Sequence, residues 1–244
     1  MITDQIPDSH TIGISILLHL LPGVLIGLGY WTVLPALQSA GYPSIMALMV
    51  AVALILVPFE LGYLLLQGYR KHGRLSLKGL IAYRDAIPIW QYVIWVSLLF
   101  VGVGLIFTLM RPVDTFLQTT LFAWLPTLES GLEGGFDRDT LIVTYAMVAV
   151  FGALVGPIVE ELYFRGYLLP RMAYAGKRAP LLHSFLFALY HVFTPWMILT
   201  RTLGMLPLVY AVRRRNLALS IIVHVMVNAI DVIAGVSLIL AMGT

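Results

Sequence analysis

Residues 141–159 read LIVTYAMVAVFGALVGPIV, a stretch without a charged side chain, and the next two residues are Glu160 and Glu161. A helix of about 20 apolar residues crosses the ~30 Å hydrocarbon core of a bilayer. An ionisable group at that depth costs at least ~2.5 kcal/mol on insertion scales, so such groups usually face a cavity and serve a function. The stretch therefore predicts a membrane-spanning helix that ends in a functional pair of carboxylates.

The whole chain has the same apolar character. Of its 244 residues, 60% are hydrophobic and only 11% are charged, and the mean hydropathy is +0.92. Soluble domains have about 25% charged residues. The absence of cysteine excludes disulfides, thiol catalysis and thiolate metal ligands. The sequence has no patch of interleaved basic and aromatic residues, so we expect no nucleic-acid binding. We therefore expect an all-α, polytopic membrane protein that forms a single integral membrane domain over residues 1–244, with the lipid bilayer as its surroundings.

Seven apolar segments are candidates for membrane spans. The fifth is short, so it is either tilted, enclosed by other helices, or longer than its apolar run. A further apolar segment, Thr115–Leu125, is too short to cross and is interpreted as interfacial or re-entrant; counted as a span, it gives eight. We predict seven to eight transmembrane helices around an intramembrane polar cavity. The seven segments are Ile12–Leu34, Ser44–Gly68, Pro88–Met110, Thr140–Arg165, Pro180–Phe193, Trp196–Val212 and Asn216–Met242.

The basic residues indicate the orientation of these spans. Cytoplasmic loops of membrane proteins are enriched in Lys and Arg. With seven spans and the N-terminus inside, 12 of the 15 basic residues lie on the inner side. The sequence thus predicts an inside N-terminus, and the small size of the chain favours a prokaryotic cytoplasmic membrane. The twelve are Arg70, Lys71, Arg74, Lys78, Arg84, Arg165, Arg171, Lys177, Arg178, Arg213, Arg214 and Arg215.

Helical spacing separates the roles of the two carboxylates in the fourth segment. Glu161 and Arg165 are four residues apart, so they meet on one face of a helix and can pair. Glu160 is rotated by about 100° from Glu161 and has no such partner. A carboxylate in a partly dry cavity is suited to accept and release a proton. We therefore interpret Glu160 as a general base and the other two as its scaffold; the alternative is a charge cluster that only joins helices.

Two later segments each place a histidine among apolar residues. His191 follows Phe187 by one turn, and His224 precedes Asn228 by one turn. A lone histidine on an apolar helix is more often a packing residue, but Glu160 and His224 also require a polar cavity. An imidazole and a carboxamide on one face can both donate to an oxyanion. The alternative for this pair is interhelical hydrogen bonding, worth ~0.6 kcal/mol in membranes.

Other polar residues in the spans are interpreted as structural. Asp231 follows on the face of Asn228 and is expected to orient a neighbour or to bind water. Glu60 is expected to pair helices or line the cavity, and His19 to form a hydrogen bond in the interior. His183 is expected to face the headgroups. Arg201 either extends outward or pairs with an acid, and the sequence does not decide between the two.

Taken together, three motifs resemble those of the CPBP family of membrane proteins. They occur in the family's order and with its spacing: Glu160-Glu161-x3-Arg165, Phe187-x3-His191 and His224-x3-Asn228. The family includes the CAAX prenyl proteases and bacterial relatives described as abortive-infection or bacteriocin-processing proteins. The resemblance implies an all-helical intramembrane endopeptidase with its catalytic helices within residues 140–230. It also implies roles: Glu160 and His191 activate a water, His224 and Asn228 hold the oxyanion, and Glu161 with Arg165 supports the site.

Metal dependence is a separate question, because members of this family have been labelled metalloproteases. Glu160, His191 and His224 could supply three zinc ligands, with water as the fourth. However, the chain has no His-Glu-x-x-His helix, and no acid is clearly placed to orient His191. Zinc binding by His224 would also remove it from the oxyanion. We therefore expect no metal and no other cofactor, with zinc as the alternative.

The leading functional hypothesis is an intramembrane endopeptidase that acts on a peptide or membrane protein reached from the inner leaflet. One branch of the resembling family suggests a prenylated C-terminal tail as substrate. A proton-coupled transporter is an alternative, because transporters also place acids and histidines in the membrane; no internal repeat supports it. A catalytically silent scaffold or immunity protein is the third hypothesis, and the complete set of acid, histidines and asparagine argues against it.

Overall fold

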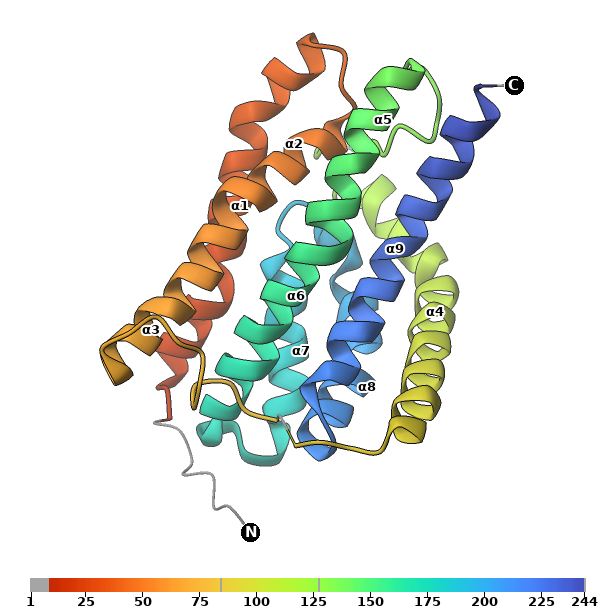
Figure 1. Cartoon of the computed structure of the whole chain (residues 1–244). Coiled ribbons are helices and arrows are strands. Elements are labelled where there is room, and N and C mark those ends of the chain that lie inside the picture. Colours follow the sequence, from red (N-terminus) through yellow and green to blue (C-terminus); the bar gives the residue numbers. More distant parts are fainter. Residues whose placement is uncertain (1–8, 84, 127, 244) are drawn as a thin grey trace.

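The structure is a computed structural model that describes residues 9–83, 85–126 and 128–243. Arg84, one of the predicted inner basic residues, lies outside this part of the chain. All regular elements of the described part are helices (Figure 1). These elements form six continuous helices that are long and apolar enough to cross a membrane, as an integral membrane protein requires. The six are Ile12–Ser39, Ser44–His72, Ile89–Thr120, Arg138–Arg171, Pro195–Arg214 and Leu217–Ala241.

Several of these long helices consist of consecutive segments with different hydrogen bonding. The first is α1 (Ile12–Ser39), and the second joins α2 (Ser44–Ala51), the π-helical η1 (Val52–Leu61) and α3 (Gly62–His72). The third is α4 (Ile89–Thr120). The fourth joins α5 (Arg138–Met147), π-helical η2 (Val148–Val155), α6 (Gly156–Glu160), π-helical η3 (Glu161–Leu168) and η4 (Leu169–Arg171). After η5 (Ala173–Arg178) and α7 (Ala179–Tyr190) come η6 (Pro195–Met197), α8 (Ile198–Arg214) and α9 (Leu217–Ala241).

Side chains cap the starts of three of these helices. Each accepts a hydrogen bond from a backbone N–H of the first turn, which would otherwise lack a partner inside the helix. At Asp137, two hydrogen bonds from Thr140 hold the pKa of the carboxyl below its usual value. The capping pairs are Thr11 with Ile14, Asp137 with Thr140, and Asn216 with Ala218.

Helix α7 corresponds to the fifth predicted span and is too short to cross. Its 12 residues extend about 18 Å at 1.5 Å per residue, against ~30 Å of hydrocarbon. It packs between α1 and α8, and most of its residues are buried. The described part thus has six candidate spans instead of seven. The path of the chain still has seven segments, and α1 begins and α9 ends at opposite ends of the bundle (Figure 1).

Thr115–Leu125 does not form the re-entrant element that was one of its two predicted forms. Helix α4 continues without a break to Thr120, so most of this segment extends the third span instead of forming a separate interfacial element. Pro112 and Asp114 interrupt the apolar run in the sequence, but they do not end the helix. Pro112 lies inside it, and Asp114 is nearly buried. The Thr200 hydroxyl on α8 donates to Asp114 Oδ1 at 2.5 Å, which stabilises the acid there.

Two glycines bring α1 close to the end of α7. A Cβ at Gly23 would lie 2.0 Å from the backbone oxygen of Tyr190, and one at Gly27 would lie 2.8 Å from the Val192 side chain. Small residues at such spacing allow membrane helices to approach closely. Behind this contact, the Phe164 ring packs against Phe187 and Tyr190, with centroids 5.0 and 4.8 Å apart. The end of α7 is therefore held from two sides.

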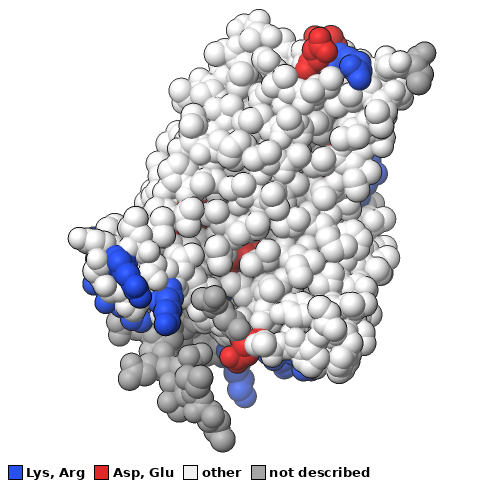
Figure 2. Space-filling view, in the orientation of Figure 1, with Lys and Arg blue, Asp and Glu red and all other residues white. Residues whose placement is uncertain are grey.

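The surface matches a protein embedded in lipid. Figure 2 shows that most of this face is uncharged, and that charged side chains gather mainly at the ends of the bundle. Large apolar side chains of α4 point outward, among them Val93, Leu98 and Leu109. Acyl chains are as apolar as leucine, so these side chains are compatible with a bilayer.

Candidate active site

Four of the predicted catalytic side chains line one cavity of about 710 Å³. They come from three parts of the chain that are distant in sequence: Glu160 ends α6, His191 follows α7, and His224 and Asn228 lie on α9. The cavity wall is otherwise mostly apolar. The structure therefore brings together the acid, both imidazoles and the carboxamide.

Glu161 and Arg165 lie behind the cavity wall, fully buried. Their spacing predicts an ion pair, and the Glu161 Oε1 to Arg165 Nη1 distance is 2.9 Å. The same Oε1 lies 2.9 Å from Nδ1 of His224. The Ser220 hydroxyl donates to the other oxygen, Oε2, at 2.6 Å. Glu161 thus joins its own helix to α9 and orients the His224 ring.

The Arg165 guanidinium is held by charge and by a ring. Its Cζ lies 3.9 Å from the centroid of Phe187, a cation–π contact. Apart from the ion pair with Glu161, no hydrogen-bond partner of the three guanidinium nitrogens is found among the described residues. Removing one member of a buried pair typically costs 3–5 kcal/mol, because the other charge stays buried alone.

Glu160 faces the opposite side of the His224 ring. Its Oε2 lies 3.8 Å from Nε2 of His224, which is beyond direct hydrogen-bond distance. Because Nδ1 of His224 is directed at Glu161, Nε2 is the nitrogen turned toward Glu160 and the cavity. Glu160 itself is buried, with 7% of its surface exposed. The two neighbouring carboxylates therefore contact different nitrogens of one imidazole.

His191 is oriented by the backbone. Helix α7 ends at Tyr190, so His191 caps the helix instead of lying within a span that reaches Phe193. Its Nδ1 lies 2.9 Å from the Phe187 carbonyl oxygen. A carbonyl can only accept, so Nδ1 holds the proton, and the unprotonated Nε2 is free for the cavity. The orienting group that the sequence did not reveal is a main-chain oxygen.

Asn228 compensates for a proline in the neighbouring helix. Its Nδ2 donates to the Gly152 carbonyl oxygen at 2.8 Å. In the π-helical register of η2, a carbonyl accepts from the N–H five residues later, as the Phe151 carbonyl does from Gly156. For Gly152 that residue is Pro157, which has no N–H. Asn228 supplies the missing donor, and its second Nδ2 proton stays available.

Three residues of the site were not identified in the sequence. Ser220 contacts Glu161 and lies one turn before His224 on α9, so spacing from His224 could have indicated it. Gly152 contributes only its carbonyl, which no sequence pattern reveals. Arg201 lines the cavity, and its Nη1 donates to the Thr194 carbonyl oxygen at 3.1 Å. It is thus turned inward, so the prediction that it extends outward is wrong, and pairing with an acid stays a prediction.

A buried histidine pair lies between α1 and α7. His19 is buried and hydrogen-bonded, as predicted: Nδ1 lies 2.7 Å from the Ser15 carbonyl oxygen, and Nε2 lies 3.0 Å from Nδ1 of His183. The prediction that His183 faces the headgroups is wrong, because this residue is fully buried. The pairing with His19 and the enclosure of α7 by its neighbours are the physical reason.

Two acids outside the catalytic set differ in environment. Glu60 is fully buried, and neither carboxylate oxygen has a hydrogen-bond partner among the described residues. It is not among the residues that line the cavity, and its predicted role in pairing helices stays a prediction. Asp231 does line the cavity, on the face of α9 that also presents Asn228, and it is exposed.

The zinc alternative requires at least three protein donor groups around one point of the cavity. Within the described part of the chain, no group of three or more His, Asp or Glu side chains is arranged to hold a metal ion. Nδ1 of each of the two cavity histidines is directed at an oxygen of the protein, Glu161 for His224 and the Phe187 carbonyl for His191. Zinc-binding histidines donate their other ring N–H to a carboxylate or carbonyl in the same way, so this arrangement does not exclude zinc, and metal dependence stays a prediction.

Comparison with known protein families gives a match in the C-terminal part of the chain. Residues 142–230 match the model of a family described as Type II CAAX prenyl endopeptidase Rce1-like. The matched segment includes Glu160, Glu161, Arg165, His191, His224 and Asn228. No curated protein and no solved structure matches the chain.

Proposed function

Because residues 142–230 form a domain of the Rce1-like type II CAAX prenyl endopeptidase family, a family of peptidases, we propose that the protein is an intramembrane endopeptidase. Its active site is the cavity lined by Glu160, His191, His224 and Asn228. The substrate is a peptide or a membrane-protein segment. The observation that supports the proposal most is the convergence of these four side chains, from three helices, on one cavity. If each residue had only a structural role, the four side chains would not need to line the same cavity.

In the proposed reaction, Glu160 and His191 activate a water. The two protons of a water can point at the Glu160 carboxylate and at Nε2 of His191, which leaves a lone pair for the peptide carbonyl. Glu160 takes one proton as the water attacks, as a general base does. That proton is then available to the amine that leaves when the peptide bond breaks. The hydrogen bond from His191 Nδ1 to Phe187 supports this orientation.

His224 and Asn228 stabilise the oxyanion that forms during the attack. Because Nδ1 of His224 donates to Glu161, donation by Nε2 to the oxyanion requires the imidazolium form. Asn228 uses one Nδ2 proton for Gly152 and offers the other. Removing one oxyanion donor typically lowers kcat by about 10²–10³. Glu161 acts by holding His224, and Arg165 balances the charge of Glu161.

The test of this proposal is the substitution Glu160→Gln, which keeps the size of the side chain but removes the base. We expect cleavage of a prenylated CAAX peptide, or of a membrane peptide accumulated in cells that express the variant, to fall by about 10²–10⁴. Expression and unfolding temperature should stay close to those of the parent protein. Glu129→Gln, at an exposed acid, is the matched control and should retain full activity.

Unchanged cleavage by Glu160→Gln would contradict the assignment of the base. A cellular function that persists in this variant while no cleavage occurs would instead identify a scaffold. Solute-driven proton uptake that depends on Glu160 would identify a transporter.

We further propose that the reaction needs no metal. The support is that no three His, Asp or Glu side chains of the described residues are grouped to hold a metal ion. Purified protein dialysed against excess 1,10-phenanthroline or EDTA should keep its activity. The Glu160→Gln variant, treated in parallel, sets the background. Loss of activity with chelator, restored by added zinc, would overturn the metal-free mechanism and would leave the peptidase assignment intact.

A further inference from the structure

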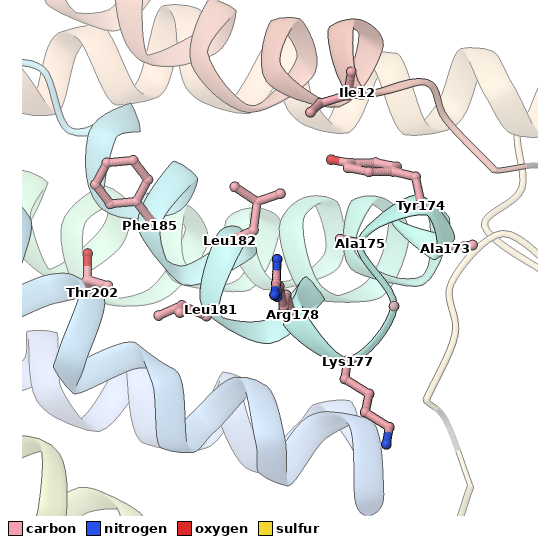
Figure 3. Close-up of a pocket in the computed structure, with 11 residues that line it drawn as sticks. Ile12, Ala173, Tyr174, Ala175, Lys177, Arg178, Leu181, Leu182, Phe185 and Thr202 are labelled. Atoms are coloured by element: carbon pink, nitrogen blue, oxygen red, sulfur yellow. The ribbon is translucent and has the colours of Figure 1, made fainter.

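A second cavity, of about 870 Å³, shares no lining residue with the candidate active site. It lies at the start of α7, between η5, the first turn of α1 and one residue of α8 (Figure 3). Nothing in the proposed peptidase reaction uses it. Its two parts, an apolar wall and a basic mouth, differ in chemistry.

The wall is apolar and open to the bilayer. Leu181 and Phe185 on the outer face of α7 are 52% and 41% exposed, and Leu182 lies beside them. Figure 3 shows Leu182 and Phe185 on the side of α7 that faces Ile12. At the far end, the Thr202 hydroxyl already donates to the Ile198 carbonyl oxygen at 2.7 Å. Apart from the Tyr174 hydroxyl near Ile12, the wall offers little hydrogen-bonding capacity and suits a hydrocarbon chain.

The mouth is basic and lacks a neutralising acid. Lys177 and Arg178 are both exposed and line the cavity directly before α7 begins. No ion pair joins either of them to an acid among the described residues. The sequence also contains no Asp or Glu from residue 162 to residue 230. Within the described part of the chain, two cations thus stand next to an apolar groove without a local counter-charge.

We propose that this cavity binds one anionic phospholipid. Its phosphate lies at Lys177 and Arg178, and one acyl chain lies along Leu181, Leu182 and Phe185. The charge and the apolar wall together identify the occupant: a soluble anion would leave the wall unoccupied, and an uncharged lipid would leave the cations unpaired. Basic pockets between transmembrane helices bind anionic headgroups in this way.

Bound lipid would also stabilise the folded chain. A ligand that binds only the native state raises the free energy of unfolding by RT ln(1 + L/Kd), where L is the concentration of free ligand. The groove is formed by η5, α1 and α7, three elements that must be in place together. Lipid binding should therefore be measurable as retention and as a shift in unfolding temperature, independently of any peptidase activity.

The experiment uses the full chain, purified in detergent and delipidated. Phosphatidylglycerol or phosphatidylcholine is then added, and lipid retention is measured by native mass spectrometry and stability by thermal unfolding. We expect one phosphatidylglycerol to be retained, with a raised unfolding temperature, and phosphatidylcholine to be retained much less. The double substitution Lys177→Gln/Arg178→Gln should weaken phosphatidylglycerol retention by about 30-fold, since each cation near the membrane surface contributes about a fivefold attraction. Leu182→Trp, which fills the groove, should weaken retention of both lipids.

The matched control is Arg74→Gln/Lys78→Gln, which removes the same charge from an exposed loop and should leave retention unchanged. Equal retention in the two double variants, or equal retention of the two lipids by the parent protein, would overturn the proposal. Displacement of the lipid by millimolar inorganic phosphate would show that the site takes a free anion. Displacement by a farnesylated peptide at equal concentration would assign the groove to substrate instead.

Discussion

Glu161 makes more contacts with the site than its position in the sequence indicates. It faces Arg165 on its own helix, Nδ1 of His224 on α9, and the Ser220 hydroxyl. The i,i+4 spacing reveals only the first of these, because the other two reach across to another helix. The carboxylate is fully buried, so its partners determine both the stability of this region and the direction of the His224 ring.

The contribution of Ser220 can be measured by Ser220→Ala. The loss of a hydrogen bond to a buried carboxylate should lower the free energy of unfolding by about 1.5–3 kcal/mol. It should also lower kcat, because the His224 ring loses part of its support. Reversible unfolding in detergent and steady-state kinetics check the two effects.

Ser237→Ala is the control for that substitution on the same helix. Ser237 is exposed and donates only to the Ile233 carbonyl of α9, so stability should change little. A stability loss as large as that of Ser220→Ala would show that the serine hydroxyl contributes to the helix and not to Glu161.

At the scale of elements, the short helix α7 positions His191. It stops at Tyr190, below the length needed to cross, and its end is fixed by the close approach of α1 at Gly23 and Gly27. Aromatic packing of Phe164 on Phe187 and Tyr190 fixes the other side. The place of His191 at the cavity thus depends on where one helix ends and on how closely another can approach it.

Gly23→Ala tests this dependence. Its Cβ would lie 2.0 Å from the Tyr190 carbonyl oxygen, so α1 and the end of α7 must separate. Overpacking of this kind typically costs 1–3 kcal/mol, and the shift should also reduce kcat through His191. Unfolding temperature and kinetics measure both.

Gly62→Ala is the matched control, since a Cβ there meets no atom within 4 Å. In a helix interior this change should be neutral or stabilise by up to about 1 kcal/mol. Full activity and stability in Gly23→Ala would contradict the role of the α1–α7 contact.

At the scale of the whole molecule, charge and apolar surface define how the bundle sits in a membrane. The charged side chains visible in Figure 2 lie mainly at the ends, and the sides are largely apolar. Helix α3 ends with Arg70, Lys71 and His72, and two further arginines end α8. On the positive-inside rule we propose that the end formed by these helix termini faces the cytoplasm.

Single-cysteine labelling tests this orientation, and the chain has no cysteine of its own to give background. Leu75→Cys follows the basic end of α3, and Asp139→Cys lies at the start of α5, at the opposite end of the bundle (Figure 1). In intact cells a membrane-impermeant maleimide should label Asp139→Cys only, and both after permeabilisation. Labelling of Leu75→Cys alone in intact cells would reverse the orientation.

The sequence by itself determined the helical class, the approximate bounds of the long helices other than α4, and the pairing of Glu161 with Arg165. These depend on apolar length and on helical spacing, both of which are properties of a single segment. Only the tertiary structure decided that Glu161 also holds His224, that Asn228 donates to the carbonyl left free by Pro157, and that His183 is buried against His19. Contacts of this kind arise where helices meet, and the place where two helices meet depends on how all of them pack together.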